Sequence, residues 1–262
     1  MIPRGYIDAW RSQAPWRSDA KVEQDLIIIR SVVAVFSNPV LSRQLTFRGG
    51  TALHKLYFHP ARRYSEDIDL VQAEAGPIGP VFDALRATLN PLLGDPQRKQ
   101  GPGVVTLTYR MSSEMPPVVP LKLKVEINSR EHFTVLGMRK VLFAMASPWF
   151  TGSCEVPTFT LEELLGTKLR ALYQRRKGRD LFDLWLGLTA GKADPKQIVT
   201  CFRKYMEHGG LQVSRQEFLQ NLADKRRHPA FTADLGDLLP VGSDYDLQAG
   251  FALVEQELVS RL

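Results

Sequence analysis

The sequence predicts an α+β fold whose strands lie in the first half of the chain and whose second half is helical. Short alternating or apolar runs, typical of strands, occur before residue 155. After Thr160, apolar residues recur at helical spacing. We therefore expect residues 1–155 to form an α/β domain with N-terminal helices and residues 156–262 to form a helical C-terminal domain.

The first seventy residues are expected to contain two helices and two short strands. From Asp19, apolar side chains follow helical spacing until Asn38-Pro39 ends the run. Residues 44–48 are expected to form a short extended segment. Gly49-Gly50 separates this segment from a second helix that is expected to start at Thr51. The segment SEDIDLV then has the pattern of a short strand bounded by polar residues.

The next segment is expected to contain a helix and a hairpin. Residues 82–93 have a helical pattern, and PQRKQGPG at 96–103 is typical of a surface turn. VVTLTYRM at 104–111 is expected to be a strand, and LKLKVEIN at 121–128 alternates strictly between apolar and polar residues. We expect these two strands to pair across the proline-rich link between them.

The remainder of the chain is expected to be helical. Thr160 and Glu163 have the spacing of a capping box ahead of an apolar stripe at Leu161, Leu164, Leu165, Leu169 and Leu172. A break near Lys177-Gly178 precedes a second helix in DLFDLWLGL. Further helices are expected over 195–207, 214–224 and 245–261.

The composition excludes a disordered chain and a membrane-spanning protein. With 262 residues, 44% of them hydrophobic, the chain can bury a full core, which excludes global disorder. The net charge of +6 suits an anionic partner. Cys154 and Cys201 have neither disulfide-like nor metal-like spacing, and there is no apolar run near the roughly 20 residues of a membrane span. We expect a soluble, cytoplasmic protein that does not enter a membrane.

Gly49, Gly50 and Thr51 lie between a short strand and the start of a helix. Glycine lets the backbone approach a phosphate closely, and the N–H groups of a helix N-terminus favour an anion. The alternative is an ordinary glycine turn with Thr51 as the N-cap. The segment is not a P-loop, since no Gly-Lys-Ser/Thr follows.

Asp67 and Asp69 are two residues apart in the expected strand, so both carboxylates lie on one face and Ile68 and Leu70 face the core. Two like charges this close repel unless a cation lies between them, and Mg²⁺ is the natural candidate. Glu126 would add a third carboxylate if its strand neighbours the first. The alternative in each case is a solvated polar face.

Lys168 falls in the middle of the apolar stripe of its helix, so it must reach the rim or meet an anion. Asp180 and Asp183 share one face of the next helix. Arginines precede these acids, and a local salt-bridge network is the alternative to a functional role.

Taken in order, these motifs resemble a known family. The run FRGGTALHKLYFHPARRYSEDIDLV, followed by KVEIN and by TLEELLGTKLRALYQRRKGRDLFDL, resembles the AbiEii/AbiGii toxin family of nucleotidyltransferases, which includes the MenT toxins. The resemblance covers about residues 45–190. It implies the polymerase-β-like nucleotidyltransferase fold, with a mixed sheet followed by a helical C-terminal half.

The resemblance also implies roles for individual residues. A nucleoside triphosphate would be held by Gly49, Gly50, Thr51 and Ser65, and its charge would be neutralised by Lys168. Catalytic Mg²⁺, two ions in all, would be held by Asp67, Asp69 and Glu126. Asp180 matches the essential acid of the following helix, with Asp183 as the other candidate.

The implied function is that of a toxin in a toxin–antitoxin system. It would transfer a nucleoside monophosphate from an NTP to the 3′ end of tRNA, which blocks aminoacylation and translation, and a separate antitoxin protein would control it. The basic residues expected to contact RNA are Arg62, Arg63, Arg175, Arg176 and Lys177, unless they are merely solvated surface. Alternative functions are nucleotidylation of a protein hydroxyl and non-catalytic binding of NTP or RNA. A ribonuclease toxin is a further alternative, but the sequence has no arrangement of His or Glu residues that suits one.

Overall fold

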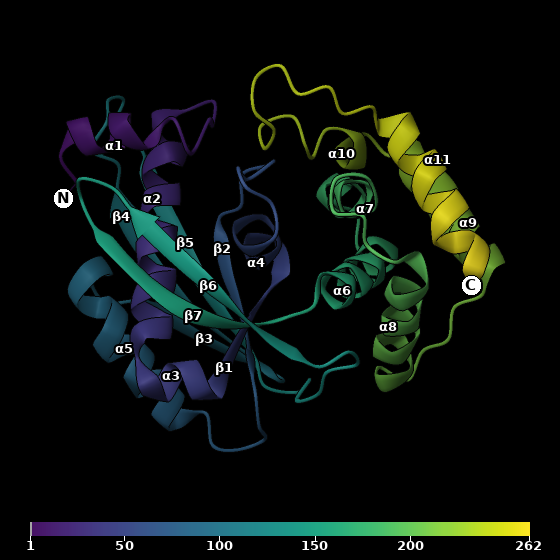
Figure 1. Ribbon diagram of the computed structural model, residues 1–262, viewed down its shortest axis with the longest axis horizontal. Helices are drawn as coiled ribbons and strands as arrows, with labels where there is room; N and C mark the ends of the chain where they lie inside the picture. Colours follow the sequence, from purple (N-terminus) through teal and green to yellow (C-terminus); the bar gives the residue numbers. More distant parts are fainter. Residues whose placement is uncertain (1) are drawn as a thin grey trace. The chain divides into compact units, whose positions relative to one another are not determined.

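The computed structural model describes every residue from Ile2 to Leu262 and divides into two compact units (Figure 1). The first unit comprises the residues up to Phe133 together with Met138–Thr158. The second comprises Thr134–Gly137 and Phe159–Leu262. A short segment between two strands of the first unit therefore belongs to the second.

The first unit is built on a seven-stranded mixed sheet with the strand order β3-β4-β5-β2-β1-β7-β6. The strands are β1 (Leu45–Arg48), β2 (Asp67–Gln72), β3 (Gln97–Gly101), β4 (Val104–Ser112), β5 (Pro120–Asn128), β6 (Met138–Ala146) and β7 (Thr151–Phe159). The central strand β2 pairs antiparallel with β1 and parallel with β5. The expected strands near 45, 68, 104 and 121 are confirmed, whereas β6 and β7 were not predicted.

The hairpin of β4 and β5 forms as predicted. The two strands pair antiparallel from Val104↔Asn128 to Ser112↔Pro120. Along β5 the apolar residues are buried and the polar residues between them are not: Leu121, Leu123, Val125 and Ile127 are at most 4% exposed. One face of the hairpin therefore belongs to the core, and the other carries Lys122, Lys124 and Glu126.

The prediction of a surface turn over residues 96–103 is wrong for most of this segment. Gln97–Gly101 forms the edge strand β3, which pairs antiparallel with β4. Every residue of β3 is exposed, so it has no apolar alternation that a sequence pattern could reveal. Backbone pairing with the nine-residue strand β4 forms this strand, and only the Pro102-Gly103 corner is a turn.

The helices of the first unit pack on strands of the sheet or on one another (Figure 1). They are α1 (Arg4–Trp10), α2 (Asp19–Ser37), α3 (Pro39–Gln44), α4 (Gly49–Leu56) and α5 (Gly79–Leu93). The long helix α2 contacts β2, β5 and β6, and α3 and α5 pack beside it. Asp25 of α2 is fully buried and pairs with Lys55 of α4, which ties α4 to the core.

The second unit is helical, as predicted. Its elements are α6 (Leu161–Gln174), α7 (Gly178–Thr189), α8 (Pro195–His208), α9 (Arg215–Arg226), α10 (Pro229–Thr232), α11 (Leu247–Glu257) and a terminal 3₁₀ turn (Val259–Arg261). The predicted capping box of α6 is only half formed. Thr160 accepts a hydrogen bond from the Glu163 backbone N–H, but the Glu163 carboxylate points elsewhere.

The Glu163 side chain instead holds the segment Thr134–Gly137 against α6. It is fully buried and accepts hydrogen bonds from Thr134 Oγ1 (2.8 Å), Val135 N (2.9 Å), Leu136 N (2.8 Å) and Tyr205 Oη (2.9 Å). Four donors compensate the desolvation of this carboxylate. This contact explains why residues 134–137 belong to the helical unit.

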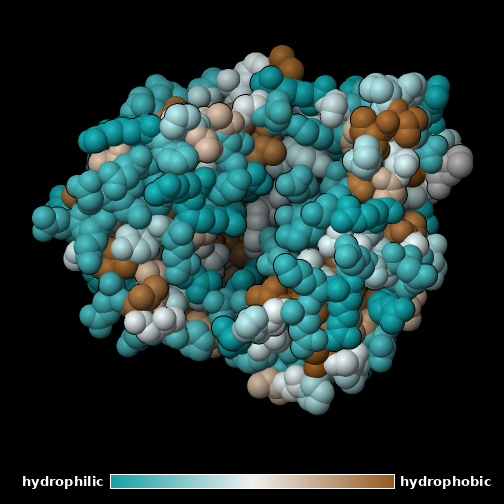
Figure 2. Space-filling view, turned by 180° about the vertical axis from the view of Figure 1, so that it is seen from behind, coloured by the Kyte–Doolittle hydropathy of each residue, from teal (hydrophilic) through white to brown (hydrophobic). Residues whose placement is uncertain are grey.

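Over residues 2–262, no helix has both the length and the apolar character needed to cross a bilayer. The face seen in Figure 2 is largely hydrophilic, and its hydrophobic residues form small separate groups.

Candidate active site

The strand β2 carries two carboxylates on one face. Ile68 and Leu70 are at most 1% exposed, whereas Asp67 and Asp69 are partly exposed on the opposite face. The predicted alternation of this strand is therefore confirmed. β5 lies parallel to β2 with Asp69 opposite Glu126, so the third predicted carboxylate is on the adjacent strand and the same face.

Gly49 lets α4 begin directly beside Asp69. It follows β1, has a positive φ of 79°, and Arg48 lies opposite Asp69 in the register of β1 and β2. A Cβ atom at Gly49 would lie 2.7 Å from Asp69 Cγ and closer still to Oδ2. Only glycine satisfies both the backbone conformation and this approach. The start of α4 and the carboxylate of Asp69 are consequently in direct contact.

Gly50 and Thr51 lie at the start of α4, where no side chain caps the free backbone N–H groups. The Thr51 side chain is fully buried, and its hydroxyl donates to the backbone carbonyl of Asp67. Its single proton is used there, so the Ser65 hydroxyl, 2.8 Å away, is the donor in the second bond. Thr51 therefore offers a phosphate its backbone N–H, and its hydroxyl is committed to joining α4 to β2.

Arg63 lies beneath this turn. It is 1% exposed and donates from Nη1 to the Tyr64 carbonyl at 2.9 Å. A Cβ atom at Gly50 would lie 2.5 Å from Arg63 Nη2, so the glycine makes room for the guanidinium. The prediction that Arg63 contacts RNA needs correction, because its side chain is inside the protein and supports the Gly49-Gly50 turn.

The electrostatics of the two aspartates favour a cation. Burial and the neighbouring charge of Asp69 raise the pKa of Asp67 to about 6. Burial opposes the charge of Lys124, but the carboxylates of Asp67 and Glu126 raise the pKa of this lysine. Lys124 lies opposite Asp67 in the register and is the cation nearest to this pair on β5.

The donor set fits a hard divalent cation in part. Carboxylate oxygens are the ligands that Mg²⁺ prefers, and Asp67 and Asp69 share a face on which negative charge is only partly compensated. Glu126 is paired with Lys124 at 3.3 Å. Within residues 2–262, no three His, Cys, Asp or Glu side chains are gathered as a metal site. The pair of aspartates is formed, and the role of Glu126 as a third ligand stays a prediction.

In the second unit, Lys168 lies between two acids of α7. Its Nζ is 3.1 Å from Asp180 Oδ1 and 2.9 Å from Asp183 Oδ2, and all three side chains are at most 7% exposed. Arg175 makes a bidentate contact with Asp180 at 2.7 and 2.8 Å. The salt-bridge network that we considered as an alternative is thus present, and it explains how a lysine lies within an apolar stripe.

The remaining basic residues predicted to bind RNA are on the surface. Arg62, Arg175, Arg176 and Lys177 are exposed. Arg175 is committed to Asp180, and Lys177 lies 3.4 Å from Asp234. Their predicted contact with RNA stays a prediction.

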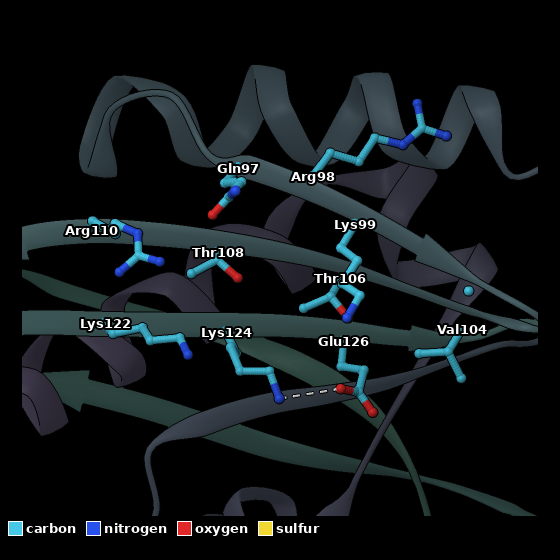
Figure 3. Close-up of a pocket in the computed structure, with 11 residues that line it drawn as sticks. Gln97, Arg98, Lys99, Val104, Thr106, Thr108, Arg110, Lys122, Lys124 and Glu126 are labelled. Carbon is cyan, nitrogen blue, oxygen red and sulfur yellow. Dashed lines mark ion pairs between the residues drawn. The ribbon is translucent and has the colours of Figure 1, made fainter.

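The sequence reasoning missed one polar face of the sheet. Figure 3 shows Lys99, Arg110, Lys122 and Lys124 lining a groove on β3, β4 and β5. In the register of the strands, β5 brings this groove beside the aspartates of β2. The alternation of β5 indicates that Lys122 and Lys124 share a face. The composition of residues 97–101 is typical of a turn, so the sequence does not indicate that this face extends onto a further strand.

Comparison with known proteins identifies the family. Residues 30–253 match the family model described as nucleotidyl transferase AbiEii toxin, type IV toxin–antitoxin system. Among curated proteins, no sequence matches this chain.

Solved structures agree on the fold. The MenT4 nucleotidyltransferase toxin of Mycobacterium tuberculosis H37Rv is similar with a TM-score of 0.59 and 17% identity, over 100% of this chain and 91% of that one. JHP933 of Helicobacter pylori has a TM-score of 0.54 and 16% identity, over 93% and 95% of the two chains. A putative nucleotidyltransferase from H. pylori has a TM-score of 0.53 and 15% identity, over 94% and 99%. The predicted polymerase-β-like fold is confirmed, and the family match spans most of the sequence: this chain belongs to the AbiEii family of nucleotidyltransferase toxins.

Proposed function

We propose that this protein transfers a nucleoside monophosphate from an NTP to the 3′ end of tRNA, and that it needs Mg²⁺ to do so. Blocked tRNA ends cannot be aminoacylated, so translation would stop. The family is one of toxin–antitoxin systems, and we therefore also propose that a cognate antitoxin protein controls the activity.

One observation carries the proposal: the carboxylate of Asp69 lies against Gly49, at the uncapped start of α4. Backbone N–H groups at a helix N-terminus attract phosphate, and carboxylates attract the metal that accompanies a triphosphate. This juxtaposition suits a bound metal–triphosphate pair better than either group alone. An ordinary glycine turn does not require a carboxylate at that position.

In the first unit, different residues would bind the triphosphate and the metal. The N–H groups of Gly50 and Thr51 would orient the triphosphate, and the hydroxyl of Ser65 would join them after release from Thr51. Asp67 and Asp69 would hold the metal, and Glu126 would join them after release from Lys124. Mg²⁺, when bound, supplies charge neutralisation for the phosphates and lowers the pKa of a coordinated hydroxyl.

In the second unit, the proposal concerns the ion-pair cluster around Lys168. We assign to Lys168 a role toward the triphosphate charge, with Asp180 as the acid that orients it. Asp183 and Arg175 complete the network, so Lys168 is held in one position.

The test is a labelling assay with purified protein. Total tRNA, Mg²⁺ and each α-³²P-labelled NTP are incubated in turn with the wild type, with Asp67→Asn and with Asp83→Asn. Asp83 is an exposed carboxylate of α5 and serves as the matched control. We expect label at the tRNA 3′ end with the wild type and with Asp83→Asn, and a loss of at least about 1,000-fold with Asp67→Asn, since about 4 kcal/mol of transition-state stabilisation corresponds to that factor.

Each other outcome contradicts a named part of the proposal. Label in protein would mean that the acceptor is a protein hydroxyl and not tRNA. Full activity of Asp67→Asn would mean that the aspartate pair is not part of the active site. Activity in the presence of EDTA would mean that the reaction does not need a metal.

A further inference from the structure

The open face of β3, β4 and β5 carries a cluster of positive charge, which we call the basic face and define as Lys99, Arg110, Lys122 and Lys124. These residues line a groove of about 550 Å³ together with Thr106, Thr108 and Glu126 (Figure 3). We propose that the basic face binds the sugar–phosphate backbone of a single RNA strand, the acceptor of the transfer reaction. This inference rests on the proposed function and names where its second substrate lies.

The register of the strands shows that these side chains share one face. Arg110 lies opposite Lys122, and Thr108 lies opposite Lys124. Lys99 lies opposite Thr106, which in turn lies opposite Glu126. Directly opposed residues point to the same side of a sheet. The opposite face is apolar along β4 and β5, where α2 and α5 cover it.

The basic face is continuous with the aspartates. Asp67 lies opposite Lys124, and Asp69 lies opposite Glu126. Read across the strands, one row runs Lys99, Thr106, Glu126 and Asp69, and the next runs Gln97, Thr108, Lys124 and Asp67. A ligand on the basic face would therefore reach the two carboxylates at its end.

The two sides of β2 differ in what they offer. On the β1 side, Gly49 and the start of α4 contact Asp69, where we place the triphosphate. On the β5 side lie the cations of the basic face. With the triphosphate on one side of the aspartates, an acceptor that reacts with it in line would approach from the other.

The charges of the basic face are largely uncompensated. Lys124 pairs with Glu126. For Lys99, Arg110 and Lys122 there is no ion pair with any acid of residues 2–262, and all three are exposed. Uncompensated cations that share one face attract a polyanion and release its counterions.

The chemistry of the groove indicates contact with the backbone of the strand. Its lining includes no aromatic side chain on which a base could stack. The hydroxyls of Thr106 and Thr108 lie among the cations and can donate to phosphate oxygens. We therefore infer binding with little dependence on base sequence, governed by salt.

The test measures RNA binding without NTP, by fluorescence anisotropy of a labelled single-stranded 12-mer across a salt series. The variant is Lys99→Gln/Arg110→Gln/Lys122→Gln, which leaves Lys124 beside Asp67 unchanged. The matched control removes the same charge elsewhere: Arg139→Gln, Lys140→Gln and Lys204→Gln. All three residues are exposed, and none of them lines the groove.

We expect the triple variant to bind RNA at least about 30-fold more weakly than the wild type. The slope of log K against log salt concentration should become shallower by about 2, since each lost phosphate contact on a single strand contributes about 0.7. The control should bind like the wild type. Two 12-mers of unrelated sequence should give the same result. Equal loss in variant and control would reduce the effect to net charge and overturn the proposal.

Further readouts separate this inference from the proposed function. If the wild type labels tRNA and the triple variant binds RNA as tightly as the wild type, the proposal that the basic face binds RNA is wrong and the proposed function is supported. If the triple variant loses RNA binding but the wild type labels no RNA, the face binds RNA and the function is wrong. Loss of binding to vesicles of phosphatidylcholine and phosphatidylserine, with RNA binding unchanged, would assign the face to an anionic lipid surface and overturn the proposal. Binding of ATP to the variant, measured by calorimetry, should equal that of the wild type.

Discussion

Asp69 occupies the space into which any side chain at position 49 would project. The Cγ of Asp69 is 2.7 Å from the ideal Cβ position of Gly49, and Gly49 has a φ of 79°. The first residue of α4 and the second aspartate of β2 are thus fixed relative to each other by contact between the Gly49 backbone and the Asp69 side chain. The position of the carboxylate then depends on this glycine as much as on its own strand.

We therefore expect Gly49→Ala to reduce both stability and activity. The left-handed conformation costs an alanine about 1–2 kcal/mol, and the new Cβ must also displace Asp69. A displacement of about 1 Å in an active site can cost about 100-fold in rate. Urea unfolding and the labelling assay measure the two effects. Gly79→Ala is the control, since Gly79 has no atom within 4 Å of its Cβ position. Wild-type activity of Gly49→Ala would exclude Asp69 from catalysis.

The second prediction concerns Asp67 in protein freed of metal with EDTA. Its pKa is about 6 in the folded protein and 3.8 in its ordinary state, so the folded protein retains a proton that the unfolded chain has already released. Stability conferred by this proton is complete below about pH 4 and is lost as the pH rises through 6. A shift of about two units corresponds to roughly 3 kcal/mol.

Asp67→Asn should therefore unfold at higher urea than the wild type at pH 7.5 and match it near pH 4. Addition of Mg²⁺ at pH 7.5 should stabilise the wild type and leave the variant unchanged. A constant difference between the two proteins over this pH range would show that Asp67 does not titrate as described.

The third prediction tests the network around Lys168. Lys168→Met removes the cation that lies 2.9 Å from the buried carboxylate of Asp183, and we expect it to lower the free energy of unfolding by about 3–5 kcal/mol. Lys168→Met/Asp183→Asn should recover part of this loss, because Arg175 still neutralises Asp180. A double-mutant cycle by urea unfolding measures the coupling. Additive losses would mean that Lys168 and Asp183 do not interact.

The control for this cycle is an exposed ion pair. Lys204 lies 3.0 Å from Glu207 on α8, and both side chains are at least 60% exposed. Lys204→Met should change stability by less than about 0.5 kcal/mol.

The fourth prediction concerns Glu163. Glu163→Gln places an amide NH₂ against groups that all donate, two at each oxygen in the wild type. We expect a loss of about 2–4 kcal/mol, since hydrogen bonds to a buried charge are strong and an unsatisfied donor adds its own penalty. Thr160→Ala, which removes only the cap of α6, should cost about 1 kcal/mol. Thermal unfolding ranks the two variants, and a larger loss for Thr160→Ala would contradict the assignment.

Local periodicity predicted the parts of the site that depend on one element. Period two placed Asp67 and Asp69 on one face of β2, and helical spacing placed Lys168 within an apolar stripe. The strict alternation of residues 121–128 and the adjacent apolar strand predicted the hairpin of β4 and β5. Each of these features is decided by which side chains a strand or helix must bury.

Features that depend on distant parts of the chain were beyond such reasoning. Arg63 appears in sequence as one of two adjacent arginines, and only the fold shows that it is buried beneath Gly50. Glu163 had the spacing of a capping residue, but donors from residues 134–136 and Tyr205 compete for its carboxylate. β3 is polar on both faces, so only pairing with β4 identifies it as a strand.

The assignment of Thr134–Gly137 to the helical unit has a consequence for how the molecule can be divided. The chain passes between the units after Phe133, Gly137 and Thr158, so neither unit is one uninterrupted stretch of sequence. A fragment that begins at Phe159 would lack three of the four donors to Glu163 and would carry a buried, unsatisfied anion. A helical half produced on its own therefore needs residues 134–137 as well as residues 159–262.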